Sequence, residues 1–265
     1  MISSPDNPQV KLARLLKRRS WREKKNLFLI EGYRLVREAL EAGYPLQAVF
    51  YTPEFGATAP GRDLIARLEL QGYRCLAVAP SLMKTMATTV TPQGILAIAP
   101  RSVYPLEEIF RDKPPLVVIA EGLQDPGNLG TLWRTALGAG AGGFLITPGT
   151  VEPFNPKVVR ASMGALFRLP VAEAEPETLG EKLRAWGYKL IVGDVRAEEI
   201  LWDADLSFPL ALAVGGEARG VSAPLLAGAS AVLRIPFFGM ESLNAAIAGA
   251  IFLYEILRQN RSYGS

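Results

Sequence analysis

The sequence predicts an α/β protein in which a parallel β-sheet with helices on both faces forms the C-terminal part and a smaller α/β domain precedes it. Short apolar segments alternate with segments of helical pattern along almost the whole chain of 265 residues. The apolar segments of the C-terminal part show no alternation with polar residues, which is typical of strands covered on both faces. Hydrophobic residues make up 49% of the chain, enough for a buried core in each domain.

The N-terminal part contains a basic helix and then alternating helices and strands. Asn7 before Pro8 predicts the start of the first helix, because Asn caps helices and Pro is accepted at their first position. We expect further helices at 31–42, 63–71 and 81–85 and strands at 46–51, 74–79 and 94–99. Prolines at 100, 105, 114 and 115 indicate a linker over residues 101–115, so we expect domains at 1–100 and 116–265.

The C-terminal part contains the predicted parallel sheet. We expect strands at 116–120, 143–147, 189–194, 210–214 and 231–235, and helices at 129–139, 156–163, 177–186 and 243–258. Ligands bind such sheets beyond the carboxyl ends of the strands. The loops that begin near Glu121, Gly215 and Ile235 are therefore the candidate site.

The composition excludes several kinds of chemistry. The chain has no histidine, which removes Ser-His-Asp triads, histidine bases and histidine metal ligands. Cys75 is the single cysteine, so no intrachain disulfide or paired-cysteine metal site can form, and a reducing compartment such as the cytoplasm is favoured. No apolar run reaches the roughly 18 residues of a membrane helix or follows the N-terminus as in a signal peptide.

Positive charge is concentrated at the N-terminus. Residues 1–25 contain eight cations and two acids, which gives +6, whereas the whole chain carries +3. An apolar stripe of Val10, Leu12, Leu15 and Leu16 lies beneath the cations at helical spacing. Two interpretations stay open at this point, a solvated charged face and a surface that binds phosphates.

A glycine-rich segment at 138–143 satisfies the G-x-G-x-x-G pattern of dinucleotide-binding proteins. That pattern must follow a strand and open a helix, because the pyrophosphate binds the helix N-terminus. Here a predicted helix ends and a predicted strand begins, so the glycines indicate a helix terminator and a turn. A nucleotide-dependent oxidoreductase is therefore disfavoured.

The three candidate loops carry five polar residues of interest. Asn128 is placed to cap the helix that follows, and Arg134 lies in that largely apolar helix, where a guanidinium must pair with an anion or reach an interface. Glu217 follows two glycines that would let a ligand approach the backbone. Ser242 could cap the last helix, and Asn244 is expected inside it, where an amide needs partners.

At these residues the sequence resembles the SpoU/TrmH family of SPOUT-class RNA ribose methyltransferases. Three motifs in order carry the resemblance: Asn-Leu-Gly-Thr-Leu-Trp-Arg-Thr-Ala at 128–136, Gly-Gly-Glu-Ala-Arg-Gly at 215–220, and Ile-Pro at 235–236 followed by Ser-Leu-Asn-Ala-Ala-Ile-Ala at 242–248. Phe-Leu-Ile-Glu-Gly at 28–32 resembles the family's ribosomal-protein-like substrate-recognition domain. One departure concerns the loop Phe238–Glu241, because the spacing from Ile235 to Ser242 is one residue shorter than the family pattern.

The resemblance implies a C-terminal trefoil knot, a homodimer formed through the C-terminal domain, and S-adenosylmethionine as the cofactor, with no metal. The cofactor would be held largely by backbone groups, at Gly215, Gly216, Ile235, Pro236 and Leu243. The implied reaction is methyl transfer to a ribose 2′-hydroxyl of structured RNA. Ribosomal RNA is favoured over transfer RNA, and a non-catalytic RNA-binding or ribosome-assembly protein on the same scaffold is the alternative from another class.

The resemblance also implies roles for single residues. Arg134 would bind the adjacent RNA phosphate and stabilise the developing alkoxide, since a guanidinium stays protonated. Asn128, Ser242 and Asn244 would orient the ribose and Arg134, and Glu217 would fix the site by accepting hydrogen bonds. The candidate RNA-contacting residues of the basic N-terminal helix are Lys17, Arg18, Arg19 and Arg22.

Overall fold

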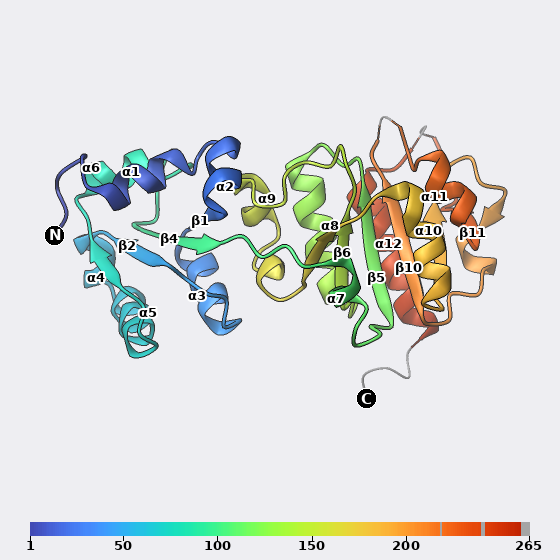
Figure 1. The fold of residues 1–265 in the computed structure, drawn as a ribbon, viewed down its shortest axis with the longest axis horizontal. Helices are drawn as coiled ribbons and strands as arrows, with labels where there is room; N and C mark the ends of the chain where they lie inside the picture. Colours follow the sequence, from blue (N-terminus) through green and yellow to red (C-terminus); the bar gives the residue numbers. More distant parts are fainter. Residues whose placement is uncertain (218, 240–241, 261–265) are drawn as a thin grey trace. The chain divides into compact units, whose positions relative to one another are not determined.

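The computed structural model describes residues 1–217, 219–239 and 242–260, and the chain forms two compact units (Figure 1). Unit 1 comprises Met1–Arg101 and Glu152–Arg168, and unit 2 comprises Ser102–Val151 and Leu169–Ser265. The units differ from the expected domains in the segment 152–168, which packs with unit 1 although it lies in sequence between strands of unit 2. Within the described residues no helix is long and apolar enough to cross a membrane.

Unit 1 contains a four-stranded sheet in the order β1-β4-β2-β3. The strands are β1 (Leu27–Glu31), β2 (Ala48–Tyr51), β3 (Cys75–Ala77) and β4 (Ile95–Pro100). β4 runs antiparallel to β1 and β2, and β2 runs parallel to β3. β1 was not predicted, and the helix expected from residue 31 begins instead at Tyr33, because Gly32 adopts a φ of +99° that ends the strand before the helix.

The helices of unit 1 surround this sheet. They are α1 (Pro8–Leu15), α2 (Arg19–Lys25), α3 (Tyr33–Glu41), α4 (Pro53–Ala57), α5 (Ala59–Leu70), α6 (Pro80–Met86), α9 (Pro156–Ala161) and the 3-10 turn η1 (Ala165–Phe167). Asn7 caps α1 as predicted, since its side chain accepts a hydrogen bond from Gln9 N. The basic N-terminal segment forms two helices, α1 and α2, rather than one.

The segment that joins unit 1 from the later part of the sequence contributes to its aromatic core. The Phe154 ring lies 4.9 Å from the Phe28 ring of β1, and the Phe167 ring lies 5.2 Å from that of Tyr44. Phe28 and Phe154 are almost completely buried. Residues 152–168 are therefore an integral part of the core of unit 1.

Unit 2 contains a seven-stranded sheet in the order β7-β6-β5-β10-β8-β11-β9, and every described pair is parallel, which confirms the predicted parallel sheet. The strands are β5 (Leu116–Glu121), β6 (Gly143–Ile146), β7 (Val171–Glu173), β8 (Lys189–Gly193), β9 (Glu199–Ile200), β10 (Leu210–Gly215) and β11 (Ala231–Arg234). The short edge strands β7 and β9 were not predicted. They lack the long apolar runs of the central strands.

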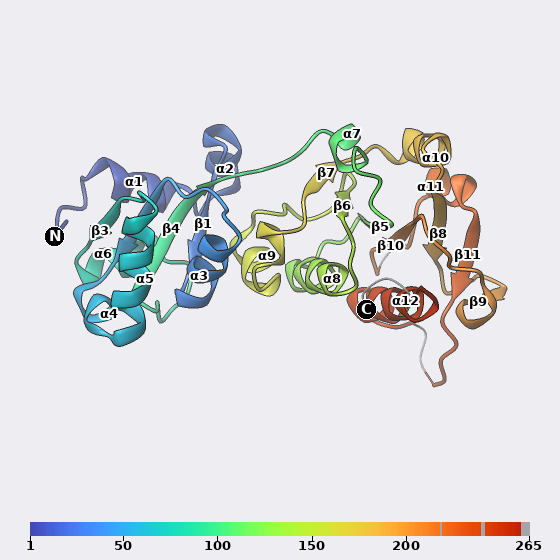
Figure 2. The ribbon, with the colours of Figure 1, turned by 90° about the horizontal axis from the view of Figure 1, so that it is seen from below.

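Helices cover both faces of this sheet (Figure 2). They are α7 (Leu106–Ile109), α8 (Pro126–Gly138), α10 (Pro176–Ala185), α11 (Ala223–Gly228) and α12 (Ala245–Gln259), with the 3-10 turn η2 (Leu201–Asp203). α8 and α12 pack side by side on one face, and α7, α10 and α11 cover the other. Gly249 allows the close approach of α12 to α8, because a Cβ there would lie 2.5 Å from Leu132 Cδ1.

Candidate functional site

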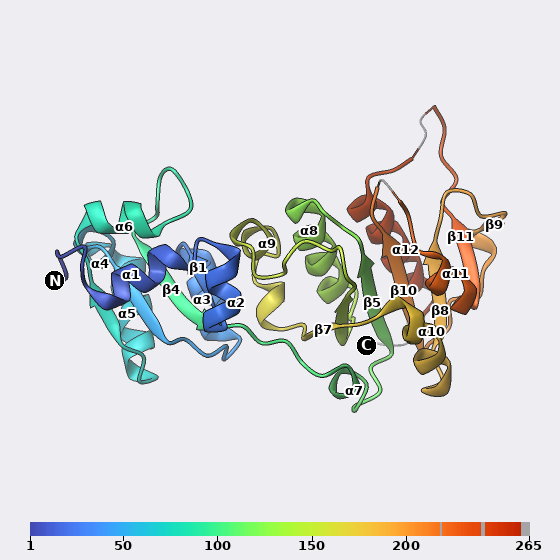
Figure 3. The same cartoon turned by 45° about the horizontal axis from the view of Figure 1, so that its top comes forward.

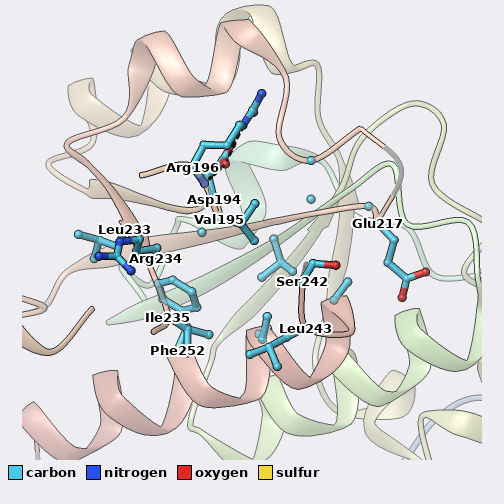
Figure 4. A pocket seen from close by; sticks show the side chains of 18 of the residues that line it. Asp194, Val195, Arg196, Glu217, Leu233, Arg234, Ile235, Ser242, Leu243 and Phe252 are labelled. Atoms are coloured by element: carbon cyan, nitrogen blue, oxygen red, sulfur yellow. Dashed lines mark hydrogen bonds and ion pairs between the residues drawn. The ribbon is translucent and has the colours of Figure 1, made fainter. Parts of the chain in front are cut away.

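A cavity of about 260 Å³ lies in unit 2 at the carboxyl ends of β8, β10 and β11 and beside the first turns of α12 (Figure 4). The loops after β10 and β11 lie at the same edge of the sheet (Figure 3). The predicted residues that line the cavity are Gly215, Gly216, Glu217, Ile235, Ser242 and Leu243. Its other lining residues are Gly193, Asp194, Val195, Arg196, Val214, Arg219, Gly220, Leu233, Arg234, Phe237, Ala245, Ala248, Gly249 and Phe252.

Backbone forms one wall of the cavity because the loop after β10 is tightly folded. A Cβ on Gly215 would lie 2.2 Å from the carbonyl carbon of Gly220, and one on Gly216 would lie 2.4 Å from Gly122 O. Both distances are far shorter than any van der Waals contact, so no side chain fits at either position. Both glycines are therefore required by the close packing of this loop against neighbouring backbone.

Three predicted polar residues form one hydrogen-bonded cluster at this edge. Glu217 Oε1 accepts hydrogen bonds from Asn128 Nδ2 at 2.8 Å and from Asn244 Nδ2 at 3.0 Å. Asn244 Nδ2 also donates to Asn128 Oδ1 at 3.0 Å. The cluster thus joins the N-terminal ends of α8 and α12 to the loop after β10.

Both helix caps differ from the sequence predictions. α8 begins at Pro126, and its cap is Asp125, whose Oδ1 accepts a hydrogen bond from Asn128 N at 2.8 Å. Asn128 is therefore not the cap, and its side-chain amide is available to Glu217. Asn244 lies not inside α12 but at its cap, where its Oδ1 accepts from the backbone of the first turn, whereas Ser242 is exposed before the helix.

Arg134 does not join the cluster. It lies on the solvent face of α8 and is exposed. It makes no hydrogen bond or ion pair with another residue in the described part of the chain. Its guanidinium is free to meet a ligand.

The remaining predicted contacts of the third loop are only partly described. Ile235 is buried and lines the cavity, whereas Pro236 is half-buried and is not among the lining residues. In the loop Phe238–Glu241, Phe238 is 96% exposed, and Met240 and Glu241 lie outside the described residues.

The candidate RNA-contacting cations divide into exposed and buried residues. Lys17, Arg18 and Arg19 are exposed, as expected for a contact surface. Arg22 is buried at 3% exposure, where its Nε lies 3.0 Å from both carboxylate oxygens of Glu152 and its Nη1 donates to two backbone carbonyls. Arg22 is therefore a structural residue of unit 1 and not a surface contact, because its donors are satisfied inside the fold.

Sequence reasoning missed the acid at one end of the cavity. Asp194 follows β8 and pairs with Arg196 through Oδ2 and Nη2, 2.7 Å apart. The Arg196 hydrogen bond holds the pKa of the Asp194 carboxyl below its usual range, although partial burial acts to raise it. Asp194 ends a predicted strand at the ligand-binding edge, and this position could have indicated a site residue. The three candidate loops, which begin near Glu121, Gly215 and Ile235, do not include it.

Comparisons with known proteins agree with this fold. Residues 115–254 match the model of the SpoU rRNA Methylase family, and residues 7–97 match that of the MRM3-like substrate binding domain. The chain is 33% identical to the 23S rRNA (guanosine(2553)-2'-O)-methyltransferase RlmP of Bacillus subtilis, over 96% of this chain and 98% of that protein. It is 35% identical to an uncharacterized tRNA/rRNA methyltransferase of Synechocystis sp., over 97% of this chain and 93% of that protein.

Solved structures show the same relationship. The crystal structure of an AdoMet-bound rRNA methyltransferase from Sinorhizobium meliloti superposes with a TM-score of 0.87 at 32% identity, covering 100% of this chain and 98% of that chain. The SpoU methyltransferase AviRb from Streptomyces viridochromogenes in complex with AdoMet gives a TM-score of 0.84 at 29% identity, covering 97% of this chain and 100% of that chain. The likeness therefore extends over both units, and the chain belongs to the SpoU rRNA methylase family.

Proposed function

We propose that the chain transfers a methyl group from S-adenosylmethionine to a ribose 2′-hydroxyl of ribosomal RNA. The observation that carries this proposal is the cluster of Asn128, Glu217 and Asn244 beside a glycine-walled cavity. The similarity along the whole chain to a protein named as a 23S rRNA 2′-O-methyltransferase supports the choice of ribosomal RNA. A ribosomal substrate and the unpaired Cys75 support the cytoplasm as the compartment.

The cavity suits S-adenosylmethionine. Peptide groups at Gly215, Gly216, Ile235 and Leu243 would hold the cofactor, with Pro236 fixing the backbone next to Ile235. Apolar side chains, among them Leu233 and Phe252, complete the walls and would accept the adenine. When bound, the cofactor supplies an electrophilic methyl group, so the protein mainly has to align the receiving oxygen and exclude water.

The polar cluster keeps two groups free to orient a ribose. Both hydrogens of Asn244 Nδ2 are used within the cluster, and Asn128 Nδ2 uses one of its two in the contact with Glu217. One Asn128 N–H and Glu217 Oε2 have no partner among the described residues. We assign them to a ribose hydroxyl as donor and acceptor, with the exposed Ser242 hydroxyl at the cavity wall as a further orienting group.

Arg134 is not part of the cluster, so it needs a partner from outside its own chain to act at this site. It lies six residues after Asn128, which is roughly 9 Å along the helix axis and about 120° around it. The proposed partners are a second copy of the chain in the homodimer and an RNA phosphate that Arg134 binds. In that complex Arg134 stabilises the developing alkoxide. Ile247 and Tyr254, 51% and 60% exposed on α12 beside α8, support a dimer surface because a second copy would cover these apolar side chains.

The trefoil knot belongs to the same proposal. β10 and β11 lie on either side of β8, and α12 returns from β11 to pack on β10, which is compatible with a threaded chain end. In unit 1 the proposed RNA contacts are Lys17, Arg18 and Arg19, all exposed at the N-terminal helices.

The test is methyl transfer to purified RNA. The full chain with isotope-labelled S-adenosylmethionine should methylate ribose 2′-hydroxyls at a defined position of unmodified ribosomal RNA and leave transfer RNA unlabelled. Glu217→Ala should lower kcat by about 100-fold, because misplaced reacting groups cost that much, while the affinity for the cofactor changes far less. The matched control is Glu181→Ala, an exposed glutamate on α10, which covers the face of the sheet opposite α8 and α12.

Labelled transfer RNA would redirect the proposal to that substrate. Tight binding of ribosomal RNA without any methyl transfer would instead support the non-catalytic alternative.

A further inference from the structure

We propose that Asp194 binds a ribose hydroxyl of the nucleoside in the cavity and that Arg196 fixes its carboxylate for this contact. The inference rests on the proposed function, because it concerns the nucleoside part of S-adenosylmethionine. Asp194 belongs neither to the three loop motifs nor to the hydrogen-bonded cluster around Glu217. In Figure 4 the side chains of Asp194 and Glu217 lie apart among the residues that line the cavity.

The fold holds Asp194 firmly at the cavity wall. It follows β8 directly, and its backbone N–H donates to Leu233 O of β11 at 3.0 Å. Its side chain is only 7% exposed, yet it lines the cavity. A carboxylate in this position is rigid and largely shielded from bulk water, which strengthens a hydrogen bond to a ligand.

Arg196 satisfies most of this carboxylate but not all of it. Oδ1 accepts from Arg196 N at 2.8 Å and from its Nε at 3.0 Å, and Oδ2 accepts from Nη2 at 2.7 Å. A carboxylate offers about four acceptor positions. One position on Oδ2 therefore remains for a further donor.

Asp194 Oδ2 lies near Gly220 in the wall of the same cavity. Among the described residues other than its chain neighbours, a Cβ built on Gly220 would come within 4 Å of one atom, Asp194 Oδ2, at 3.9 Å. Gly220 has a φ of +63° and lines the same cavity. We assign to this part of the cavity a ligand hydroxyl that donates to Oδ2.

The charges at this end of the cavity favour a neutral donor. The carboxylate would repel a phosphate or a carboxylate of the ligand. The adjacent Arg196 guanidinium would oppose the ammonium group of the methionine part. A ribose hydroxyl meets neither charge, and acidic residues recognise ribose hydroxyls at the carboxyl ends of strands in dinucleotide-binding folds. The apolar Leu233 and Phe252 also line the cavity and offer a surface for the attached base.

The test measures binding rather than activity. Calorimetry with the full chain would compare S-adenosylhomocysteine, the product of methyl transfer, with its 2′-deoxy and 3′-deoxy counterparts. We expect at least one deoxy compound to bind the unmodified protein about 10- to 100-fold more weakly, the range for a lost hydrogen bond to a charged group. Asp194→Asn should bind S-adenosylhomocysteine more weakly by a similar factor and should lose most of the discrimination between the ribose and deoxyribose compounds.

Two controls isolate the contact. Asp205→Asn changes an aspartate of unit 2 that pairs with Lys189 and does not line the cavity, so it should leave all affinities unchanged. Arg196→Met should weaken S-adenosylhomocysteine binding by a smaller factor, because it releases the carboxylate without removing it.

Equal affinities of the unmodified protein for all three compounds would overturn the inference, and this comparison needs no variant. Full discrimination retained by Asp194→Asn would also overturn it. Absence of any binding of S-adenosylhomocysteine to the unmodified protein would refute the proposed function itself, so the two failures are distinguishable.

Discussion

Unit 1 and unit 2 use charged side chains differently. In unit 1, Arg22 and Glu152 are buried as a pair, and the buried Glu31 accepts hydrogen bonds from backbone and hydroxyl groups of one loop. In unit 2, Glu217 is exposed at the cavity and accepts its hydrogen bonds from the side-chain amides of two helices. These buried charges of unit 1 are satisfied by its own fold, whereas Glu217 keeps an oxygen for a ligand.

A charged residue that is buried and has all its donors and acceptors paired has a structural role, whereas an exposed residue with an unpaired group can bind a ligand. Residue type alone does not make this distinction. Arg22 and Arg18 lie four residues apart in one basic segment, yet one is 3% exposed and the other is at the surface. Three substitutions in unit 1 test this distinction.

The largest effect is expected for the buried ion pair. Arg22→Ala should lower the free energy of unfolding of unit 1 by about 3–5 kcal/mol, because Glu152 would remain buried without a partner. Urea denaturation of the full chain would measure this loss. The double variant Arg22→Met/Glu152→Leu should recover most of it, since no charge is then left unpaired, and a loss below about 1 kcal/mol in Arg22→Ala would contradict the structural role.

A smaller and pH-dependent effect is expected at Glu31. Burial acts to raise the pKa of this carboxyl, but hydrogen bonds from Thr88 and Thr89 outweigh it and hold the pKa below the usual 4.5. A depressed pKa stabilises the fold above the unfolded-state pKa, and this contribution is lost as the pH falls through the folded-state pKa. Glu31→Gln should cost about 1–3 kcal/mol near neutral pH.

The pH profile provides the control for Glu31. The difference in unfolding free energy between Glu31→Gln and the unmodified protein should shrink as the pH falls below 4.5, the usual pKa of a glutamate. A difference that stays constant from pH 7 to pH 3 would show that the carboxylate charge does not contribute.

The smallest effect on stability is expected for the exposed arginines. Arg18→Glu/Arg19→Glu should change the unfolding free energy by less than about 1 kcal/mol, because surface pairs such as Arg19 with Glu23 contribute little. The same variant should bind ribosomal RNA more weakly and with a shallower salt dependence, while its affinity for S-adenosylmethionine is unchanged. Unaltered RNA affinity across a salt titration would remove these residues from the proposed contact surface.

The sequence was most informative where local pattern determines structure. Continuous apolar runs predicted the five longer strands of unit 2, and their parallel pairing placed the loops of Glu217 and Asn244 at one edge. Local pattern could not distinguish Asp125 from Asn128 as a cap, because both residue types cap helices and they lie three residues apart.

The features that the sequence did not predict depend on contacts with residues far away in the chain. Arg22 and Glu152 are 130 residues apart in the sequence, so nothing near Arg22 indicates that its charge is buried. The apolar neighbours of Arg134 predict its helix but not which face of that helix is exposed, because the partners that cover the other face come from distant parts of the chain.

Because Glu152–Arg168 belongs to unit 1, the two units cannot be exchanged between proteins as two consecutive pieces of sequence. The chain passes between the units three times, so neither unit is encoded by one continuous stretch. A fragment ending at Arg101 would lack Glu152, the ion-pair partner of Arg22, and Phe154, which packs on Phe28. Chimaeras that exchange recognition units between relatives therefore need three junctions, and the segment between β6 and β7 has to be inherited with the N-terminal unit whose core it completes.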